Sequence, residues 1–570
     1  MSSDLRTQFA TPDADRLAGV VAHARRDAWA QRLADRDTTL WSDDPAVRAA
    51  IAQRLGWLDA PDHFTRQVPA IEAFGDRVRV DGFTTAVVMG MGGSSLAPEV
   101  LHRTFGTAEG YLDLRILDST DPAAVAATVD DLDPLQTLWI IASKSGTTTE
   151  PLAFMADAWA RVEAALAARG SDQGPWEFFA AITDPGRSLE AIPHHGDLRE
   201  RFLNLPDVGG RYSALTYVGL VPASLIGLDL DALLASATAM LAECREPDPE
   251  ANPGLLLGLA LGSLARAGRD KLTFLADPGI EAFGAWLEQL LAESTGKQGV
   301  GILPIDREPL AHAASYGPDR AFVRLVLRGE EDTARDKLAA QLADRGHPVV
   351  RVEIDDPIDL GGEFVRWEVA TAFAGAVLGI NPFDQPNVED AKERARRALS
   401  DAAALGGGSG AATPATEDDT LRVADVGERG LTEALRSLVR LQPPSYVAIQ
   451  AFIAPGEGRE AAIARMRSGI TDHTSCASTA GYGPRFLHST GQLHKGGPPT
   501  GVFLQLTSDH PADRPIPGWP YTFGRLIDAQ ARGDREALRT HVRPVLQIHL
   551  GPDLDADLTT VERAVFQALR

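Results

Sequence analysis

The sequence predicts an α/β protein made of doubly wound parallel sheets. Short, continuously apolar runs such as TTAVVMG (residues 84–90) and TLWIIAS (residues 137–143) are each followed by a loop and then by a segment of helical periodicity. Runs of the same kind recur later, as KLTFLA and VVRVEI and again as YVAIQAFIA and PVLQIHL. A parallel sheet requires this alternation, because the helices that connect parallel strands cover both of its faces.

Three such series divide the chain into candidate units. Residues 1–60 have apolar side chains at helical spacing and are expected to form N-terminal packing helices. We place a first α/β unit at residues 61–245, a second at 246–400 and a third at 419–570. Residues 401–418 are rich in Gly, Ala, Ser and Thr and are expected to be a flexible linker, because they bury too little apolar surface to become ordered.

Composition and charge exclude several functions. The 570 residues include 55 Lys and Arg and 79 Asp and Glu, so the net charge is −24 at pH 7, and there is no basic run. Such a charge repels nucleic acid and anionic membrane surfaces, so neither is expected as a partner. The two cysteines, Cys244 and Cys476, are too few for a disulfide scaffold. The first residues lack the apolar region of a secretory signal, and no apolar stretch is long enough to span a membrane, so we expect a cytoplasmic protein.

The first loop that is suited to binding an anion is GMGGSS (residues 90–95). Its glycines let the backbone approach an anion, and the helix that follows points its first amides at it. A dinucleotide fingerprint would need a third glycine where Ser95 stands. Taken alone, this loop is equally well explained as a tight turn between a strand and a helix.

The second such loop, SKSGTTTE (residues 143–150), has six hydroxyl or ammonium donors in its first seven positions. Donors at a helix N-terminus are suited to a single phosphate dianion, held by hydrogen bonds rather than by bulk charge. Simple helix capping, the alternative, would use one hydroxyl and leave the others unexplained. A Walker A loop is excluded, because the Gly296-Lys297 pair would need a glycine at Leu291 and a hydroxyl at Gln298.

These loops carry a resemblance to a known family. VVMGMGGSSLAPEVL and IIASKSGTTTEPL are similar to the sugar isomerase (SIS) domain. Three later segments occur in the order found in the glucose-6-phosphate isomerase family, namely VGGRYS (208–213), LLAESTGK (290–297) and NPFDQPNVEDAK (381–392). The third unit resembles the C-terminal part of the isomerase half of bifunctional transaldolase/glucose-6-phosphate isomerase proteins. The resemblance implies SIS-type folds for the first two units and an SIS-like third unit.

The resemblance also implies the reaction, which is the interconversion of glucose 6-phosphate and fructose 6-phosphate in glycolysis and gluconeogenesis. This reaction opens the sugar ring and moves a proton between C2 and C1 through a cis-enediolate. Glu293 matches the family's base, which takes and returns that proton. Arg211 matches the arginine that stabilises the enediolate oxygen. Without the resemblance, both residues would be assigned as ordinary solvated side chains.

Further site residues follow from the same motifs. Lys392 matches the family's ring-opening lysine, and Gln385, in the FDQ motif before it, is expected to touch the substrate. The expected substrate is a small-molecule sugar phosphate. The residues that the two loops contribute to its binding are Gly93, Ser94, Ser143, Lys144, Ser145 and Thr148.

The histidine of the family is displaced in this sequence. Neither His312 nor His347, which lie after the base, has the family's His-x-x-x-Gln context. That context occurs beyond the linker at His488, which we take as the residue that opens the ring. His494 is close enough to compete for the role.

The displacement suggests a hypothesis about architecture. The third unit would be a partial duplicate of the second, with YVAIQAFIA corresponding to KLTFLA and YTFGRLIDAQARGD to GEFVRWEVATAFAG. In ordinary family members the histidine reaches the site from a neighbouring subunit. A third unit that supplies it within one chain would make the protein a pseudo-dimer that works as a monomer, with a homodimer as the alternative.

Several alternatives stay open at this stage. We expect acid/base chemistry without a metal or an organic cofactor; a metal-dependent hydride shift is the mechanistic rival, but no His, Asp and Glu cluster has ligand spacing. A non-catalytic SIS-type sugar-phosphate sensor is the rival from another class, although it would not need Glu293 or Lys392. Mannose 6-phosphate remains open as a further substrate.

Overall fold

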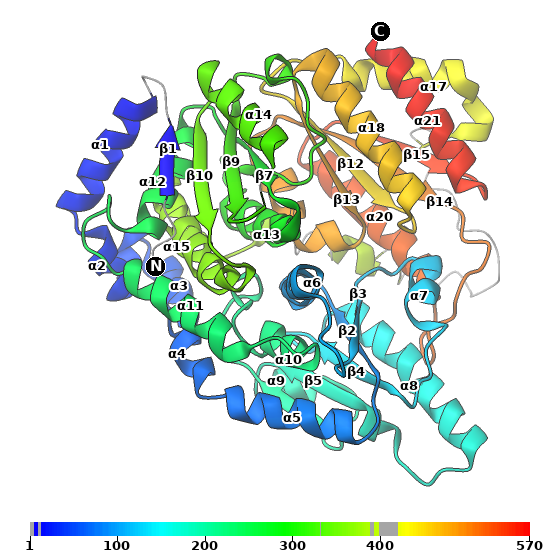
Figure 1. Ribbon diagram of the computed structural model, residues 1–570. Helices are drawn as coiled ribbons and strands as arrows, with labels where there is room; N and C mark the ends of the chain where they lie inside the picture. The colour runs from blue at the N-terminus through cyan, green and yellow to red at the C-terminus, as the bar shows by residue number, and fades with distance from the viewer. Residues whose placement is uncertain (1–4, 9–12, 331, 388–392, 398, 400–419) are drawn as a thin grey trace.

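The computed structural model describes residues 5–8, 13–330, 332–387, 393–397, 399 and 420–570. It contains three five-stranded sheets, one in each predicted unit. In Figure 1 the first unit lies at the bottom, the second at upper left and the third at upper right, with one helix, α6 (Gly93–Phe105), at the centre. The prediction of doubly wound parallel sheets is confirmed. The predicted linker, residues 401–418, lies outside the described residues.

Four core strands have the same order in all three sheets, namely β2 to β5, β7 to β10 and β12 to β15. In each set the first strand lies between the second and the third, the fourth lies beyond the third, and a fifth strand (β6, β1 or β11) lies at the edge beyond the fourth. Sheets of this order open a crevice beyond the carboxyl ends of the first and third strands, because their connections leave in opposite directions. In sheet order, the strands are β3 (Asp113–Leu117), β2 (Thr85–Gly90), β4 (Thr137–Ala142), β5 (Phe179–Thr183) and β6 (Glu200–Leu203) in the first sheet; β8 (Leu303–Ile305), β7 (Lys271–Ala276), β9 (Arg320–Leu327), β10 (Val349–Ile354) and β1 (Leu5–Gln8) in the second; and β13 (Ala477–Tyr482), β12 (Tyr446–Phe452), β14 (Gly501–Ser508), β15 (Val545–Leu550) and β11 (Thr420–Arg422) in the third.

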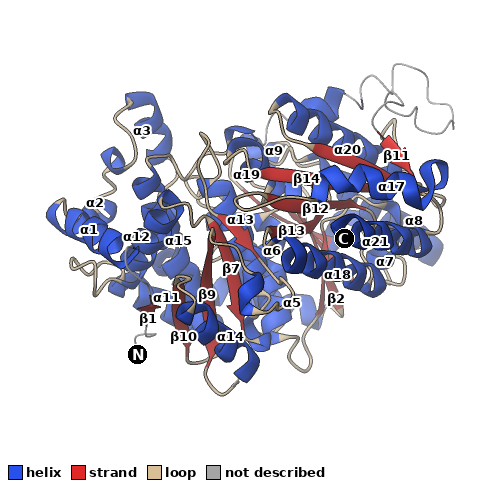
Figure 2. Cartoon of the chain, turned by 90° about the horizontal axis from the view of Figure 1, so that it is seen from above, coloured by secondary structure: helices blue, strands red, loops and turns tan. Residues whose placement is uncertain are grey.

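Helices cover the sheets on both sides (Figure 2). The crossovers and N-terminal elements are rich in apolar side chains that turn toward these sheets, as the helical spacing predicts. Besides α6, the helices are α1 (Asp13–Arg26), α2 (Trp29–Ala34), α3 (Pro45–Ala52), α4 (Ala60–Thr65), α5 (Val68–Val80), α7 (Pro122–Val129), α8 (Thr149–Arg169), α9 (Arg187–Glu190), α10 (Tyr217–Leu225), α11 (Leu230–Glu243), α12 (Pro253–Arg266), α13 (Phe283–Thr295), α14 (Thr333–Asp344), α15 (Leu360–Leu378), α17 (Val423–Val439), α18 (Glu457–Thr474), α19 (Gly491–Gly496), α20 (Phe523–Thr540) and α21 (Leu554–Leu569).

The N-terminal segment differs from the prediction. Strand β1 pairs with β10 in the antiparallel sense, with Leu5 opposite Val352, and forms the edge of the second sheet. The prediction of helices alone for residues 1–60 is therefore wrong at this strand. A strand of four residues gives too short a pattern to detect, and its pairing partner is distant in the sequence.

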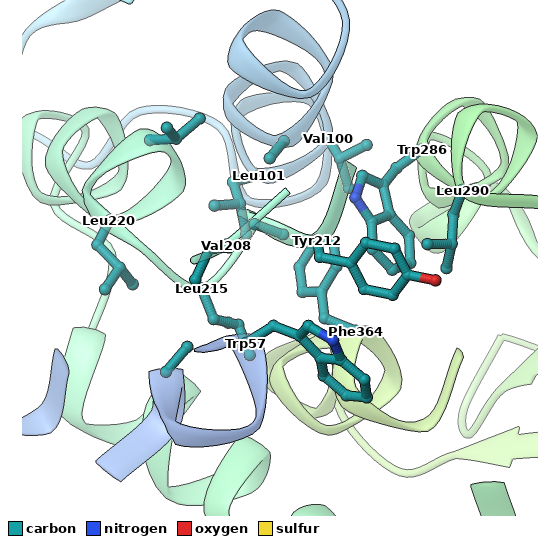
Figure 3. Packing of buried hydrophobic residues seen from close by; sticks show 14 of the residues in the cluster. Trp57, Val100, Leu101, Val208, Tyr212, Leu215, Leu220, Trp286, Leu290 and Phe364 are labelled. Carbon is teal, nitrogen blue, oxygen red and sulfur yellow. The ribbon is translucent and has the colours of Figure 1, made fainter. Parts of the chain in front are cut away.

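The first and second units share one apolar core. In Figure 3, Tyr212 of the first unit lies beside Trp286 and Leu290 of α13, and Trp57 of the N-terminal residues lies below Tyr212. The rings of Trp57 and Tyr212 stack with centroids 5.3 Å apart. The Tyr212 hydroxyl points toward α13 and lies 3.4 Å from Ser294 Oγ. Because buried aromatic rings contribute strongly to packing, this core fixes the residue next to Tyr212, Arg211, against α13.

The second and third units pack as two similar halves. Helix α13 of the second unit contacts α19, which follows the second strand of the third unit. Reciprocally, α18 contacts the short helix η6 (Ala313–Ser315), which follows the second strand of the second unit. Strands β8 and β13 meet between them, where Leu303, Tyr446 and Phe503 belong to one apolar cluster. Reciprocal contacts of this kind are typical of a two-fold pair.

The correspondence between these halves agrees with the sequence hypothesis for the strands but not for the helices. Strand β12 occupies the place of β7, as expected. Helix α20, which contains FGRLIDAQARGD, connects the third and fourth strands and therefore corresponds to α14. The predicted match to α15 is wrong, because α15 follows the fourth strand and its counterpart is α21. The two segments resemble each other in apolar composition, which does not depend on their place in the fold.

The close packing of α12 against α15 can be tested by substitution of Gly258. A Cβ at Gly258 would lie 2.4 Å from the carbonyl oxygen of Ala370, whereas a Cβ at Gly19 in α1 would meet no atom within 4 Å. We expect Gly258→Ala to lower the free energy of unfolding by about 1–3 kcal/mol, because the packed backbone must move. Gly19→Ala should raise it by up to about 1 kcal/mol. Urea denaturation of both variants checks this; equal stability of the two would contradict the packing argument.

Candidate active site

The two candidate phosphate loops follow neighbouring strands, β2 and β4, of the first sheet. In the second loop, the hydroxyl of Ser143 donates to Thr148 Oγ1 at 3.1 Å. The amide of Thr147 donates to Ser145 Oγ at 3.3 Å. These contacts fold the loop onto itself at the start of α8, so its hydroxyls gather where the crevice of this sheet is expected.

The first loop lies against the segment that carries Arg211. A Cβ at Gly93 would lie 2.0 Å from the carbonyl oxygen of Gly210, so only glycine permits this approach. Ser94 and Lys144 line one small cavity together with Gly210. The Lys144 ammonium, a candidate phosphate ligand, contacts Asp184 Oδ2 at 2.5 Å. Burial raises the pKa of this aspartate, and Lys144 partly offsets the rise.

Glu293 and Arg211 come together at the end of α13. Glu293 Oε1 lies 3.3 Å from Arg211 Nη1, and the two side chains are 10% and 3% exposed. Gln289, one helical turn before Glu293, donates from Nε2 to Glu293 Oε2 at 3.1 Å. The carboxylate is thus held from two sides in a nearly buried position.

Arg211 is fixed by four further contacts. Its Nε donates to Ser294 Oγ at 2.7 Å. Nη2 donates to the carbonyl oxygens of Pro382 at 2.8 Å and Asp384 at 3.0 Å. Nη1 donates to Gln385 Oε1 at 3.1 Å. The predicted Gln385 therefore lies beside Arg211 and Glu293, and the planar guanidinium has little freedom to turn.

His488 reaches this place from the third unit. It ends the short helix η9 (Arg485–His488), and its Nε2 lies 3.1 Å from Oε1 of Glu150, at the start of α8. Gln530 of α20 donates to the same carboxylate oxygen at 2.7 Å. The carbonyl of His488 accepts from Gln289 Nε2 at 2.8 Å. One amide group therefore bridges the carboxylate of Glu293 and the backbone of His488.

The competing histidine, His494, lies in the interior of the third unit. Its ring contacts those of Phe503 and Tyr446, with centroids 5.0 and 6.3 Å away. Burial and the nearby positive charge of Lys495 hold the pKa of His494 well below its usual value. Such a ring stays neutral and faces aromatic side chains. Lys392, the predicted ring-opening lysine, lies outside the described residues.

Lys297 is a further cation beside the site. Its side chain is 1% exposed, and its Nζ donates to the carbonyl oxygen and to Oδ1 of Asp384, at 2.5 and 2.7 Å. Burial, and next the positive charge of Arg211, lower the pKa of Lys297 to about 8. The lysine and the arginine thus hold the same carbonyl of the loop that presents Gln385.

Three residues of this site have no role in the sequence prediction. Gln289 could have been found from its i, i+4 spacing to Glu293, which places both on one face of a helix. Glu150 closes the second loop, but its partner His488 is too far along the chain for a local pattern to join them. Lys297 ends the LLAESTGK motif, but the sequence argument gives it no role, and its contact with Asp384 depends on the tertiary fold.

A buried carboxylate, a fixed guanidinium and a histidine lie beside two hydroxyl-rich loops, and groups of these kinds are what a proton transfer on a phosphorylated substrate would require. Within the described part of the chain, no group of three or more His, Cys, Asp or Glu side chains has the arrangement of a metal site. No helix among the described residues has both the length and the apolar character needed to cross a membrane.

Comparison of this chain with known proteins shows the family to which it belongs. Residues 29–303 match the phosphoglucose isomerase family. A glucose-6-phosphate isomerase from Rubrobacter xylanophilus is 31% identical over 403 residues, covering 61% of this chain and 90% of the relative. A probable glucose-6-phosphate isomerase from Natronomonas pharaonis is 32% identical over 382 residues, covering 60% and 84%. The chain belongs to the phosphoglucose isomerase family and is an aldose–ketose isomerase.

Two solved structures share the fold. A hypothetical protein from Thermus thermophilus has a TM-score of 0.57 and 24% identity, covering 70% of this chain and all of that chain (100%). A glucose-6-phosphate isomerase from Chlamydia trachomatis has a TM-score of 0.50 and 23% identity, covering 66% and 78%. The SIS-type architecture predicted from the two loops is therefore confirmed.

The lowered pKa of Lys297 predicts an alkaline limit to activity. Lys297 loses its proton as the pH rises through about 8, and the loop that fixes Arg211 then loses a charged contact. Stability should not fall in the same range: the unfolded lysine, with a pKa of about 10.4, binds its proton more tightly, so this group makes folding more favourable between pH 8 and 10. We therefore expect kcat to decline above about pH 8 while the protein stays folded.

Lys297→Arg tests this assignment, because a guanidinium stays charged throughout this range. In Lys297→Arg, the pH at which kcat declines should rise by at least about one unit. Lys297→Met should be less active at every pH and should show no alkaline decline. The measurement is kcat between pH 6 and 10, with circular dichroism at each pH. An unchanged alkaline limb in both variants would exclude Lys297 as its source.

Proposed function

We propose that this chain interconverts glucose 6-phosphate and fructose 6-phosphate, and so acts in glycolysis and gluconeogenesis. The observation that carries the proposal is the contact of Glu293 with Arg211 at 3.3 Å, in a nearly buried setting next to two hydroxyl-rich loops. The names of the relatives from Rubrobacter xylanophilus and Natronomonas pharaonis support the same substrate pair.

Substrate binding relies on hydrogen bonds more than on bulk charge. The hydroxyls of four loop residues hold the phosphate, and Gly93 lets the backbone come close to it. Lys144 contributes to the rigidity of the second loop through its ion pair with Asp184. This arrangement suits a protein with a net charge of −24, because hydrogen bonds work at contact whereas the overall field repels an anion. The four hydroxyl residues are Ser94, Ser143, Ser145 and Thr148.

Ring opening is assigned to His488. A ring oxygen needs a proton donor as its bond to carbon breaks, and an imidazole beside a carboxylate is suited to hold that proton. Glu150 orients the imidazole through the contact at 3.1 Å. Lys392 assists ring opening and Gln385 contacts the open sugar; the role of Lys392 rests on its motif.

Isomerisation is assigned to Glu293. Its carboxylate removes the proton from C2 of the open aldose and returns it to C1, or the reverse, while Arg211 stabilises the negative oxygen of the cis-enediolate. Gln289 holds Glu293 and the backbone of His488 together, so that ring opening and proton transfer occur on one bound sugar.

Glu293→Gln tests the base, with Glu288→Gln on the same helix as a matched control. Glutamine cannot take a proton, so we expect kcat to fall about 10²–10⁴-fold. Burial and next the negative charge of Asp306 raise the pKa of Glu288 to about 8, so this side chain is neutral at pH 7 and glutamine mimics it. The control should keep activity within about 2-fold, since no proton transfer depends on it. A coupled assay of fructose 6-phosphate conversion decides, and full activity of Glu293→Gln would exclude the mechanism.

We also propose that one chain is a complete catalyst. The second and third units, placed at residues 246–400 and 419–570, make the reciprocal contacts of a two-fold pair. His488 meets Glu150 and Gln289 within the same chain. No second chain is therefore required to complete the site from the residues named here.

Sedimentation of active protein tests this proposal. We expect activity per chain to stay constant on dilution and to travel with a species of 60.8 kDa, the mass of one chain. The same sample is sedimented through a solution of substrate, and product formation is followed by absorbance, so that the mass of the active species is measured directly. Activity confined to a species of twice that mass would count against a self-sufficient chain.

A further inference from the structure

Helix η9 is tied to the first unit at both of its ends. Its last residue, His488, contacts Glu150. Its first residue, Arg485, forms an ion pair with Glu99 of α6, and its Nε lies 3.4 Å from Oδ2 of Asp118, just beyond β3. The charges are complementary across the interface, because the third unit contributes the cation and the first unit both carboxylates.

The carboxylates that face Arg485 are enclosed. The side chains of Glu99 and Asp118 are 17% and 11% exposed. Burial raises the pKa of Asp118 to about 6, and a hydrogen bond from Ser95, in the first phosphate loop, partly offsets the rise. Leaving these groups without a cation would be unfavourable, since buried carboxylates need a charged partner. The pairing therefore holds η9 against the phosphate loop.

We propose that Arg485 is a positioning residue that holds His488 in place for ring opening. A 3₁₀ helix rises about 2 Å per residue, so the four residues of η9 span only about 6 Å and move as one piece. When Arg485 is anchored to Glu99 and Asp118, the imidazole of His488 is set at Glu150. The inference rests on the proposed function, because it assigns a purpose to the placement of His488.

The test separates ring opening from proton transfer. Fructose 6-phosphate closes its ring through the hydroxyl on C5, so the 5-deoxy analogue stays open and needs no ring-opening step. Both substrates are followed by proton NMR as deuterium enters from D₂O at C1. Arg485→Ala is compared with Arg514→Ala, which removes another cation of the same interface, paired with Asp157 and Asp130 at 2.8 Å each.

We expect Arg485→Ala to lower kcat for fructose 6-phosphate about 10–100-fold, because small misplacements of catalytic groups are costly, with KM nearly unchanged. On the 5-deoxy analogue the loss should be under about 3-fold, since that substrate bypasses ring opening. His488→Gln should show the same selectivity. Arg485→Lys should recover part of the activity that Arg485→Ala loses. Arg514→Ala should lower kcat equally for the two substrates or leave both unchanged.

Equal slowing of both substrates by Arg485→Ala would overturn the inference, as would the same selectivity in Arg514→Ala, because either result would mean general loosening of the interface. A different result would contradict the proposed function itself: Glu293→Gln would then keep its activity on the 5-deoxy analogue, which still requires the proton transfer. A thermal scan of each variant confirms that the compared proteins are folded.

Discussion

The contact between Glu293 and Arg211 is the interaction on which the site depends. A buried ion pair is stable only when other groups replace the water that both charges lose. Here Ser294 and two backbone carbonyls surround the guanidinium, and Gln289 donates to the carboxylate. These partners come from α13 and from the loop after α15, both in the second unit, whereas Arg211 belongs to the first, so the pair forms only when the first two units are packed together.

The three interfaces between units differ in character. The first and second units share one continuous apolar core, and the second and third meet through a smaller apolar cluster. The third meets the first through both kinds of contact: Phe523 of α20 stacks on Phe154 of α8 with ring centroids 6.0 Å apart, and Arg485 and Arg514 face aspartates and a glutamate. Apolar burial gives most of the stability of such contacts, whereas complementary charges fix the register of the two surfaces. Glu293 therefore lies where the contact between units is mainly apolar, whereas His488 lies where apolar and charged contacts occur together.

Much of the fold and part of the site follow from sequence because the signals are local. Apolar runs followed by loops and helices identify the sheets, and the contiguous motifs single out Glu293 and Arg211, which the structure brings into contact. The strand β1 and the contact of Glu150 with His488 depend on segments hundreds of residues apart, which periodicity does not join. Composition alone matches helix α20 to α15, although connectivity decides the correspondence. Local chemistry is thus predictable, and the pairing of distant residues is not.

The pairing of the second and third units explains why the site occurs in one half. Asp472 is third from the end of α18, as Glu293 is in α13, yet Asp472 is exposed. Beside it, Thr471 donates to Glu308 at 3.1 Å, and the same carboxylate oxygen lies 3.3 Å from the buried Arg320. This half uses its charges to hold the interface. Under the proposed function, a chain with one first unit binds one phosphorylated sugar at its two loops. A second base in α18 would then have no substrate to act on, and the equivalent segment is free to serve packing instead.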